Sequence, residues 1–413
     1  MKRFHYGYVI VLCCCLIMGV NVGLVMSCAG IFYQPVSDDL GVSVGEFGVY
    51  MSFNYLASTL MLSEAGRMLE RFRARWLLTA SSAVLGLCLV AMGFFNAVGQ
   101  FYLAGCIIGI ALAFLLYLSF PTMVNRWFRT RVGFFIGLCS AASGIGGILF
   151  NPVGASLISA YGWRVAYWVF GAVILCVVSP ILALLLRDNP KDKGLEPFGA
   201  VDRPQQSAPG NDAEGVEYTK ALRMPAFYGM VVFAFLMISV STLNLFIPNY
   251  VTGLDYTLAQ ASFVASAVMV GVTVGKVALG MINDRNNTLG VCITALCGIV
   301  GLTLFILGHI GFSAVVVGGF LFGWAYAGVT VQTPMLVRAV FGNRNYARIY
   351  SNISVALAAG GAITAGGWGL LADYTSFGFI FLLGIVFLAV SGGIGLYALS
   401  VQKKIKYPKT EMS

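Results

Sequence analysis

The sequence predicts an all-α integral membrane protein, with twelve transmembrane helices in two pseudo-symmetric six-helix bundles. Three observations lead to this fold class. The 413 residues are 59% hydrophobic and only 10% charged, whereas a soluble protein carries about 25% charged residues. Apolar runs of about 20 residues, the length that crosses a bilayer as a helix, recur along the chain. The second half of the sequence also repeats features of the first half.

The apolar runs are continuous and do not alternate with polar residues, which favours helices over a closed β-barrel, the other fold that satisfies its backbone in lipid. The expected spans cover residues 8–33, 45–65, 76–95, 99–125, 132–158, 164–186, 225–250, 259–282, 288–309, 312–338, 347–371 and 375–401. The first run is too long for the apolar core of a cleaved signal peptide and has no Ala-x-Ala site, so we interpret it as the first span.

One long polar connection divides the spans six and six. We expect an N-terminal six-helix bundle at 1–186, a cytoplasmic linker at 187–223 and a C-terminal six-helix bundle at 224–413. Lysines and arginines gather at both termini and in alternate loops, which the positive-inside rule places in the cytoplasm. We therefore expect both termini to be cytoplasmic and the protein to lie in the plasma membrane, which is the inner membrane in a bacterium.

The net charge of +9 follows from this loop pattern. Basic residues that flank apolar runs set the topology and meet anionic lipid headgroups. We therefore expect the lipid bilayer as a partner and no nucleic acid.

A single shift along the sequence superimposes the two halves. It lays Pro121 on Pro334, Gly154 on Gly367, Tyr161 on Tyr374 and Gly171 on Gly384. The segment Gly66-x-x-x-Glu70-Arg71 falls on Gly280-x-x-x-Asp284-Arg285 at nearly the same shift, and we expect both to form turns. Six spans per half make these parallel repeats, and substrate sites in such folds lie between the halves near the membrane midplane.

These two segments resemble the signature between the second and third spans of the major facilitator superfamily and its echo in the second half. A narrower resemblance is to the branch of monocarboxylate transporters and oxalate/formate antiporters. Three stretches carry it: Gly30-Ile-Phe-Tyr33-Gln34-Pro35, then Asn125-Arg126-Trp127-Phe128-Arg129-Thr-Arg131-Val-Gly133, and Lys276, where that branch usually carries an arginine. The resemblance implies transport of a small carboxylate, often with a proton. Residues 349–371 lack the second cation of oxalate-type members, which argues against a dicarboxylate.

Lys276 is the one lysine or arginine in the apolar interior of an expected span. A charge at the helix centre costs about 2.5–3.5 kcal/mol on insertion scales, so such residues mark functional sites. Gly271 and Gly275 are small and would let a substrate or another helix approach, and no acidic residue lies in the expected membrane core. We therefore interpret Lys276 as the cation that meets a substrate carboxylate. The alternative is that its side chain extends to the cytoplasmic surface, roughly 9 Å away along the helix.

The sequence leaves the coupling open. In proton symport, the lysine amine would take up a proton as the anion arrives, and the two would cross as a neutral pair. In anion-for-anion exchange, Lys276 would never move without a bound anion. The partners are thus a small carboxylate and, in the first case, protons.

A small carboxylate also needs neutral donors and an apolar wall. Tyrosine, asparagine and tryptophan side chains in other spans fit these roles, although each could equally make an interhelical hydrogen bond or lie in the interfacial belt. The candidates, with Tyr117 foremost after Lys276, are Tyr117, Tyr33, Asn54, Asn244, Trp324 and Tyr326.

The signature segments and the basic loops opposite them form the expected gating set. Glycines would allow close packing at the cytoplasmic helix ends, and carboxylates would pair with arginines of neighbouring loops, closing the inner side. The alternative is that these charges only set topology. The set comprises Gly66, Glu70, Arg71, Arg131, Gly280, Asp284, Arg285 and Arg344.

Other classes of function find less support. The ten cysteines lack metal-ligand spacing, no glycine-rich phosphate loop is present, and no Ser/His/Asp set supports an enzyme. We expect no cofactor, no metal and a monomeric functional unit. A porter of neutral or cationic solutes, such as a drug efflux porter, would need an acidic residue in the cavity. A transporter-derived membrane sensor would need a soluble domain longer than residues 187–223.

Overall fold

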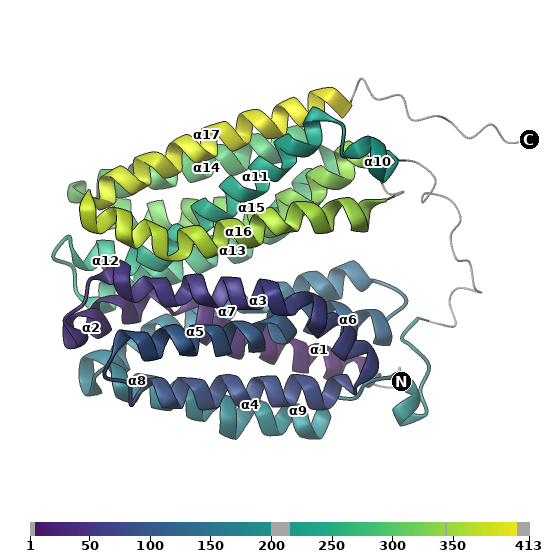
Figure 1. Ribbon diagram of the computed structural model, residues 1–413, viewed down its shortest axis with the longest axis horizontal. Coiled ribbons are helices and arrows are strands. Elements are labelled where there is room, and N and C mark those ends of the chain that lie inside the picture. Colours follow the sequence, from purple (N-terminus) through teal and green to yellow (C-terminus); the bar gives the residue numbers. More distant parts are fainter. Residues whose placement is uncertain (1–4, 200–214, 343–344, 403–413) are drawn as a thin grey trace, which may run out of the picture. The chain divides into compact units, whose positions relative to one another are not determined.

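The computed structural model describes residues 5–199, 215–342 and 345–402, with the backbone but not the side chains of Ser63, Glu70, Gly133, Ala347 and Gln402. The described residues are almost entirely helical (Figure 1). The first half contains α1 (Gly7–Leu16), η1 (Ile17–Ser27), α2 (Gly30–Leu40), α3 (Val44–Arg71), α4 (Ala74–Met92), α5 (Val98–Leu112), η2 (Ala113–Leu118), α6 (Ser119–Trp127), α7 (Val132–Tyr161), α8 (Trp163–Val173), η3 (Ile174–Val178) and α9 (Ser179–Leu185). The remainder contains η4 (Pro190–Lys193), α10 (Tyr218–Ala221), α11 (Pro225–Thr242), η5 (Leu243–Phe246), α12 (Ile247–Thr252), α13 (Leu258–Arg285), α14 (Asn287–Ile306), η6 (Gly308–Ile310), α15 (Phe312–Phe341), α16 (Tyr346–Tyr374) and α17 (Phe377–Gln402).

The membrane-spanning helices agree with the expected spans. Eleven helical stretches of the described chain are long and apolar enough to cross a membrane. The second expected span is α3, a helix of 28 residues that carries charged residues near both ends and is not among the eleven. Together with α3 these stretches supply the twelve long helices that the sequence predicts, so the all-α membrane fold is confirmed.

The chain clusters into two compact units. Unit 1 comprises Met1–Pro204, Asn244–Val270 and Ala365–Tyr374, and unit 2 comprises Gln205–Leu243, Gly271–Thr364 and Thr375–Ser413. Unit 1 therefore includes α12, the first part of α13 and the last part of α16, all from the second half of the sequence. The division into bundles at 1–186 and 224–413 stays a prediction.

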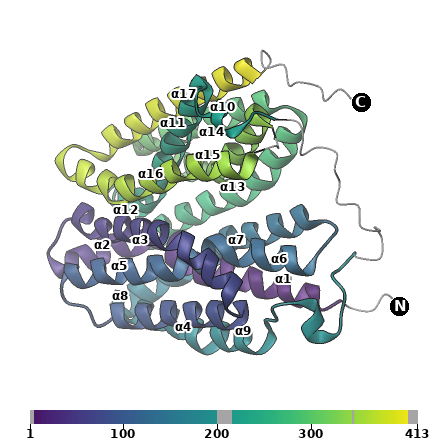
Figure 2. The same cartoon turned by 45° about the vertical axis from the view of Figure 1, so that its right-hand side comes forward.

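Within unit 1, small residues allow pairs of helices to pack closely. α3 lies beside α5, and α4 lies beside α8 and α9, in both views of the molecule (Figures 1 and 2). A Cβ atom at Gly109 of α5 would meet the Cβ of Ala57 at 2.9 Å, and one at Gly105 would contact the backbone oxygen of Tyr50. Such contacts between small residues are the usual means of helix association in lipid.

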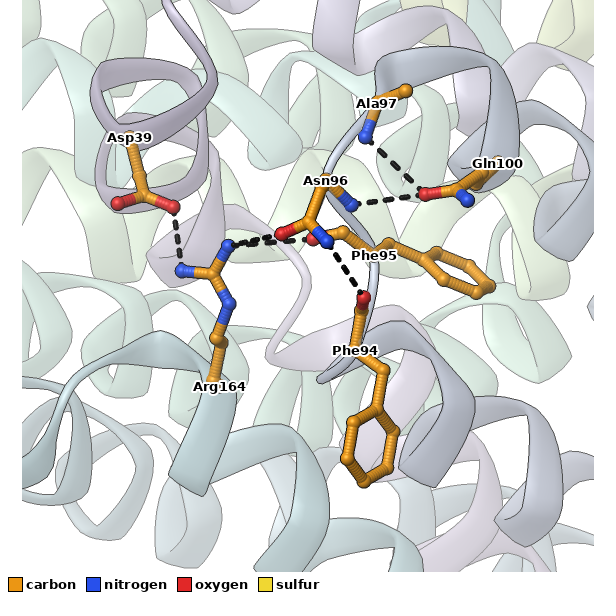
Figure 3. Close-up of polar contacts among 7 residues, drawn as sticks. All are labelled: Asp39, Phe94, Phe95, Asn96, Ala97, Gln100 and Arg164. Carbon is orange, nitrogen blue, oxygen red and sulfur yellow. Dashed lines mark hydrogen bonds and ion pairs between the residues drawn. The ribbon is translucent and has the colours of Figure 1, made fainter.

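An arginine at the start of α8 joins the end of α2 to the α4–α5 connection in unit 1 (Figure 3). Arg164, at the start of α8, forms an ion pair with Asp39 at 2.6 Å and donates to the Asn96 side chain at 3.0 Å. Gln100 accepts from the backbone N–H groups of Asn96 and Ala97 at 2.9 and 3.2 Å. These contacts give Arg164 a structural role.

Another carboxylate joins α16 to α3 within unit 1. Asp373 accepts a hydrogen bond from the Ser43 hydroxyl at 2.6 Å and one from the backbone N–H of Gly45 at 3.1 Å. Ser43 is also the N-cap of α3, because its hydroxyl accepts from the Glu46 N–H at 3.0 Å. Asp373 therefore satisfies a second N–H group at the start of α3.

Both described parts of the linker are attached to helix-end loops. Phe198 donates its N–H to Trp127 O and accepts from Arg129 N–H, both at 2.9 Å, within unit 1. Val216 donates to Phe341 O at 2.8 Å within unit 2. The shift that lays Pro121 on Pro334 also lays Phe128 on Phe341, so the linker contacts equivalent loops in the two repeats.

Candidate functional site

Lys276 lies in α13 where this helix contacts α15 inside unit 2. A Cβ atom at Gly275 would meet the Cβ of Ala327 at 3.0 Å and the Cα of Trp324 at 3.2 Å. A Cβ atom at Gly271 would contact the backbone oxygen of Phe320. Only glycine fits this approach without displacing its neighbours. The glycines beside Lys276 therefore serve helix packing.

The side chain of Lys276 is half-buried, and it is the one charged side chain between Leu258 and Asn283 of α13. A half-buried ammonium group in an apolar helix costs free energy unless polar or charged atoms approach it. This geometry is compatible with binding a carboxylate.

Two predicted site residues lie on the facing helix. Trp324 and Tyr326 of α15 are both half-buried. The indole N–H of Trp324 is buried and has no hydrogen-bond partner among the described residues. Since Trp324 packs directly against Gly275, the structure brings Trp324 next to the turn of α13 that carries Lys276.

The other predicted site residues belong to unit 1. Tyr33 is fully buried, with ring centroids of Phe47 and Phe246 both 5.3 Å from its own. Asn54 is buried with its amide nitrogen 3.5 Å from the sulfur of Met51. These two side chains therefore pack inside unit 1.

Asn244 and Tyr117 differ from Tyr33 and Asn54 in hydrogen bonding and in exposure, respectively. Asn244 is buried, and its side-chain oxygen lacks a hydrogen-bond partner within the described chain. Tyr117 lies in η2, a π-helical segment, and its side chain is 40% exposed. Such segments are frequent at functional sites. That these residues and Lys276 line one site stays a prediction.

The signature segments are helical, so the expectation of turns there was wrong. α3 continues to Arg71 and α13 to Arg285. The described residues also do not show the close helix packing expected at the two glycines. A Cβ atom at Gly66 or Gly280 would meet no described atom of another element within 4 Å. A glycine costs a helix only about 0.5–1 kcal/mol, so one near the end of a helix does not terminate it.

The described residues show few of the contacts expected of the gating charges. Arg126 donates to the Leu69 carbonyl at 3.1 Å, so a basic residue in the last turn of α6 does meet the end of α3. Arg71, Arg131, Asp284 and Arg285 are exposed. The side chain of Glu70 and the whole of Arg344 lie outside the described residues.

A buried amide pair near the second signature was not predicted. The Asn283 side chain donates to Gln332 Oε1 at 2.9 Å, and both residues are almost fully buried. Asn283 lies two helical turns after Lys276, so the two are on the same side of α13. The available signal was one amide residue just after an apolar run and another inside an apolar run, but their pairing depends on how α13 and α15 pack.

Comparison with known proteins agrees with this architecture. The profile of the Major Facilitator Superfamily matches residues 15–316. The uncharacterized MFS-type transporter YhjX of Escherichia coli K12 is 27% identical over 345 residues, which are 78% of each chain. The oxalate:formate antiporter of Oxalobacter formigenes is 22% identical over 397 residues, covering 91% of this chain and 89% of that protein. Monocarboxylate transporter 4 of Rattus norvegicus is 26% identical over 213 residues, 49% of this chain and 42% of that protein.

The fold also matches solved structures. A bacterial homolog of the human lysosomal transporter Spinster, in an inward-facing and unoccupied conformation, superimposes with a TM-score of 0.76 at 15% identity, covering 99% of this chain and all of that one. The nucleoside transporter NupG superimposes with a TM-score of 0.69 at 16% identity, covering 96% of this chain and all of that one. This chain belongs to the major facilitator superfamily and is an integral membrane protein of that transporter family.

Proposed function

We propose that this protein is a secondary active transporter of a small organic anion, in which Lys276 binds the substrate carboxylate. The observation that carries the proposal is the half-buried Lys276 in the interior of α13, one residue after Gly275, against which Trp324 of α15 packs. The ammonium supplies the charge that a carboxylate needs, and the indole supplies an N–H donor and an apolar wall. The relatives named as monocarboxylate transporters and as an oxalate:formate antiporter support this substrate class.

We further propose that transport is symport of a monocarboxylate with a proton by alternating access, in a monomer with both termini in the cytoplasm. The lysine amine would be the group that gains a proton when the anion binds. The helix ends at Arg71 and Arg285, with the basic loops near them, would close the cytoplasmic side. The Arg126 contact with the Leu69 carbonyl supports this role for the first of these ends.

Anion exchange is the second candidate, because the antiporter relative aligns with 91% of this chain. The two mechanisms predict different driving forces. A proton gradient of the right sign accelerates symport, whereas an anion loaded on the opposite side accelerates exchange.

The test is uptake of labelled lactate-sized monocarboxylates into proteoliposomes, with and without a pH gradient and with and without internal anion. Lys276→Ala should reduce uptake at least about tenfold, since a hydrogen bond to a charged group is worth about 1.5–3 kcal/mol. Lys276→Arg should retain part of the activity. Val277→Ala, at an exposed neighbouring position of the same helix, is the matched control. Unchanged uptake in Lys276→Ala would show that Lys276 does not bind the substrate.

A further inference from the structure

Unit 2 contains a small cavity with a mainly apolar wall, which the proposed transport site does not use. It lies between α11, α14, α15 and α17 and has a volume of about 10 Å³. The polar residues that line it are Gln332, Thr294 and Ser391, and all three are buried. Apolar groups, including Phe233 and Ala295, complete the wall.

The Gln332 side chain has one satisfied and one unsatisfied end. Its Oε1 accepts from Asn283 at 2.9 Å, but its Nε2 has no hydrogen-bond partner among the described residues. Leaving a buried amide donor without a partner is costly, so such groups usually bind an ordered water. Gln332 is fully buried and lines the cavity.

The two hydroxyls of the cavity have spare acceptor capacity. Thr294 donates to the Gly290 carbonyl at 2.8 Å, and Ser391 donates to the Leu388 carbonyl at 2.9 Å. Each hydroxyl oxygen keeps lone pairs that can accept a hydrogen bond. A water molecule could therefore accept from Gln332 and donate to these two oxygens.

The equivalent place in unit 1 is filled by side chains. There Asn21 donates to the Ser82 hydroxyl at 2.9 Å, and Ser179 lies 3.0 Å from the same hydroxyl. The shift that relates the two repeats lays Asn21, Ser82 and Ser179 on Ala234, Ala295 and Gly392. Unit 2 thus lacks all three polar side chains, while Gln332 stands in place of Ser119.

We propose that one ordered water molecule occupies this cavity, bound by Gln332, Thr294 and Ser391, and replaces the side-chain network of unit 1. A volume of about 10 Å³ is at the lower limit of what one water needs, and three polar partners are the usual number. By accepting a hydrogen bond from Gln332 Nε2, the water also fixes the orientation of the Gln332 side chain, whose Oε1 accepts from Asn283. Asn283 immediately precedes Asp284 and Arg285, the last two residues of α13.

The direct test is a high-resolution cryo-electron microscopy map of the full chain in nanodiscs. The expected result is density within hydrogen-bonding distance of Gln332, Thr294 and Ser391. An empty cavity in a map that resolves other buried waters would overturn the proposal.

An independent test uses two variants of similar size. Ala295→Ser restores the hydroxyl that Ser82 supplies in unit 1, whereas Ala295→Cys adds one apolar atom at the same position. The serine can displace the water and satisfy Gln332, so its Tm should be at least about 2 °C above that of the cysteine variant. A cysteine variant as stable as the serine variant would indicate a dry cavity. A Tm that rises when sodium replaces choline in the buffer would indicate a cation and would also overturn the water assignment.

Discussion

At the scale of single residues, sequence and structure differ in what they reveal about polar groups. Lys276 could be identified as a candidate from the sequence because a lone charge in an apolar run is recognisable without any knowledge of packing. The Asn283–Gln332 pair could not, because its members are 49 positions apart and meet only through the packing of α13 on α15. The same reason hides the role of Asp373, whose partners Ser43 and Gly45 lie in the first half of the sequence.

Asp373 should stabilise the first turn of α3. Asp373→Ala removes the acceptor for the Ser43 hydroxyl and the Gly45 N–H, and loss of such a cap costs about 0.5–2 kcal/mol. Hydrogen–deuterium exchange of the segment from Val44 to Phe47 should therefore accelerate.

Two further variants control this experiment. Asp373→Asn keeps a side-chain oxygen and should retain most of the protection. Tyr374→Ala, at a neighbouring position that is 87% exposed, should change nothing. Equal exchange in the alanine variants at positions 373 and 374 would refute a capping role for Asp373.

At the scale of elements, the helices were predictable and their ends were not. Hydropathy identifies a span because lipid requires a continuous apolar helix. It does not show where a helix stops once polar residues begin, which is why α3 and α13 pass through the segments expected to be turns. The chain leaves α3 only at Phe72, whose backbone is extended.

The glycines of α13 provide a second prediction. Gly271→Ala forces a Cβ atom against the Phe320 carbonyl, and overpacking of this kind costs about 1–3 kcal/mol. Gly280→Ala meets open space and should be neutral or stabilise the helix by up to about 1 kcal/mol. Thermal unfolding of the purified protein, followed by intrinsic fluorescence, should give a lower Tm for the first variant only. If both variants had a lower Tm, the close α13–α15 contact would not explain the destabilisation by Gly271→Ala.

At the scale of the whole molecule, the internal repeat predicted the twelve-helix membrane fold. It did not predict that Asn244–Val270 and Ala365–Tyr374 cluster with Met1–Pro204. A repeat is fixed in the sequence, whereas contacts at helix ends depend on which state of a transporter is observed. Sequence alone therefore specifies the spans better than the compact units.

The proposed topology can be tested by labelling. With the reactive native cysteines replaced by serine, Tyr374→Cys should react with a membrane-impermeant maleimide from outside intact cells, because the positive-inside rule places this connection outside. Arg67→Cys, at the other end of the helices and also exposed, should react only after the membrane is opened. Labelling of both sites in intact cells, or the reverse pattern, would reject the orientation.

The attachment of the linker has a consequence for how the gene could be divided. Residues up to Gly199 remain anchored through Phe198 to the loop of Trp127 and Arg129, and residues from Gly215 onward are anchored through Val216 to Phe341. A polypeptide cut between these anchors would give two fragments, each attached to its own helices through Phe198 or Val216. Such fragments, made separately in one cell, would each keep its own anchor, and this favours the site for split-protein complementation.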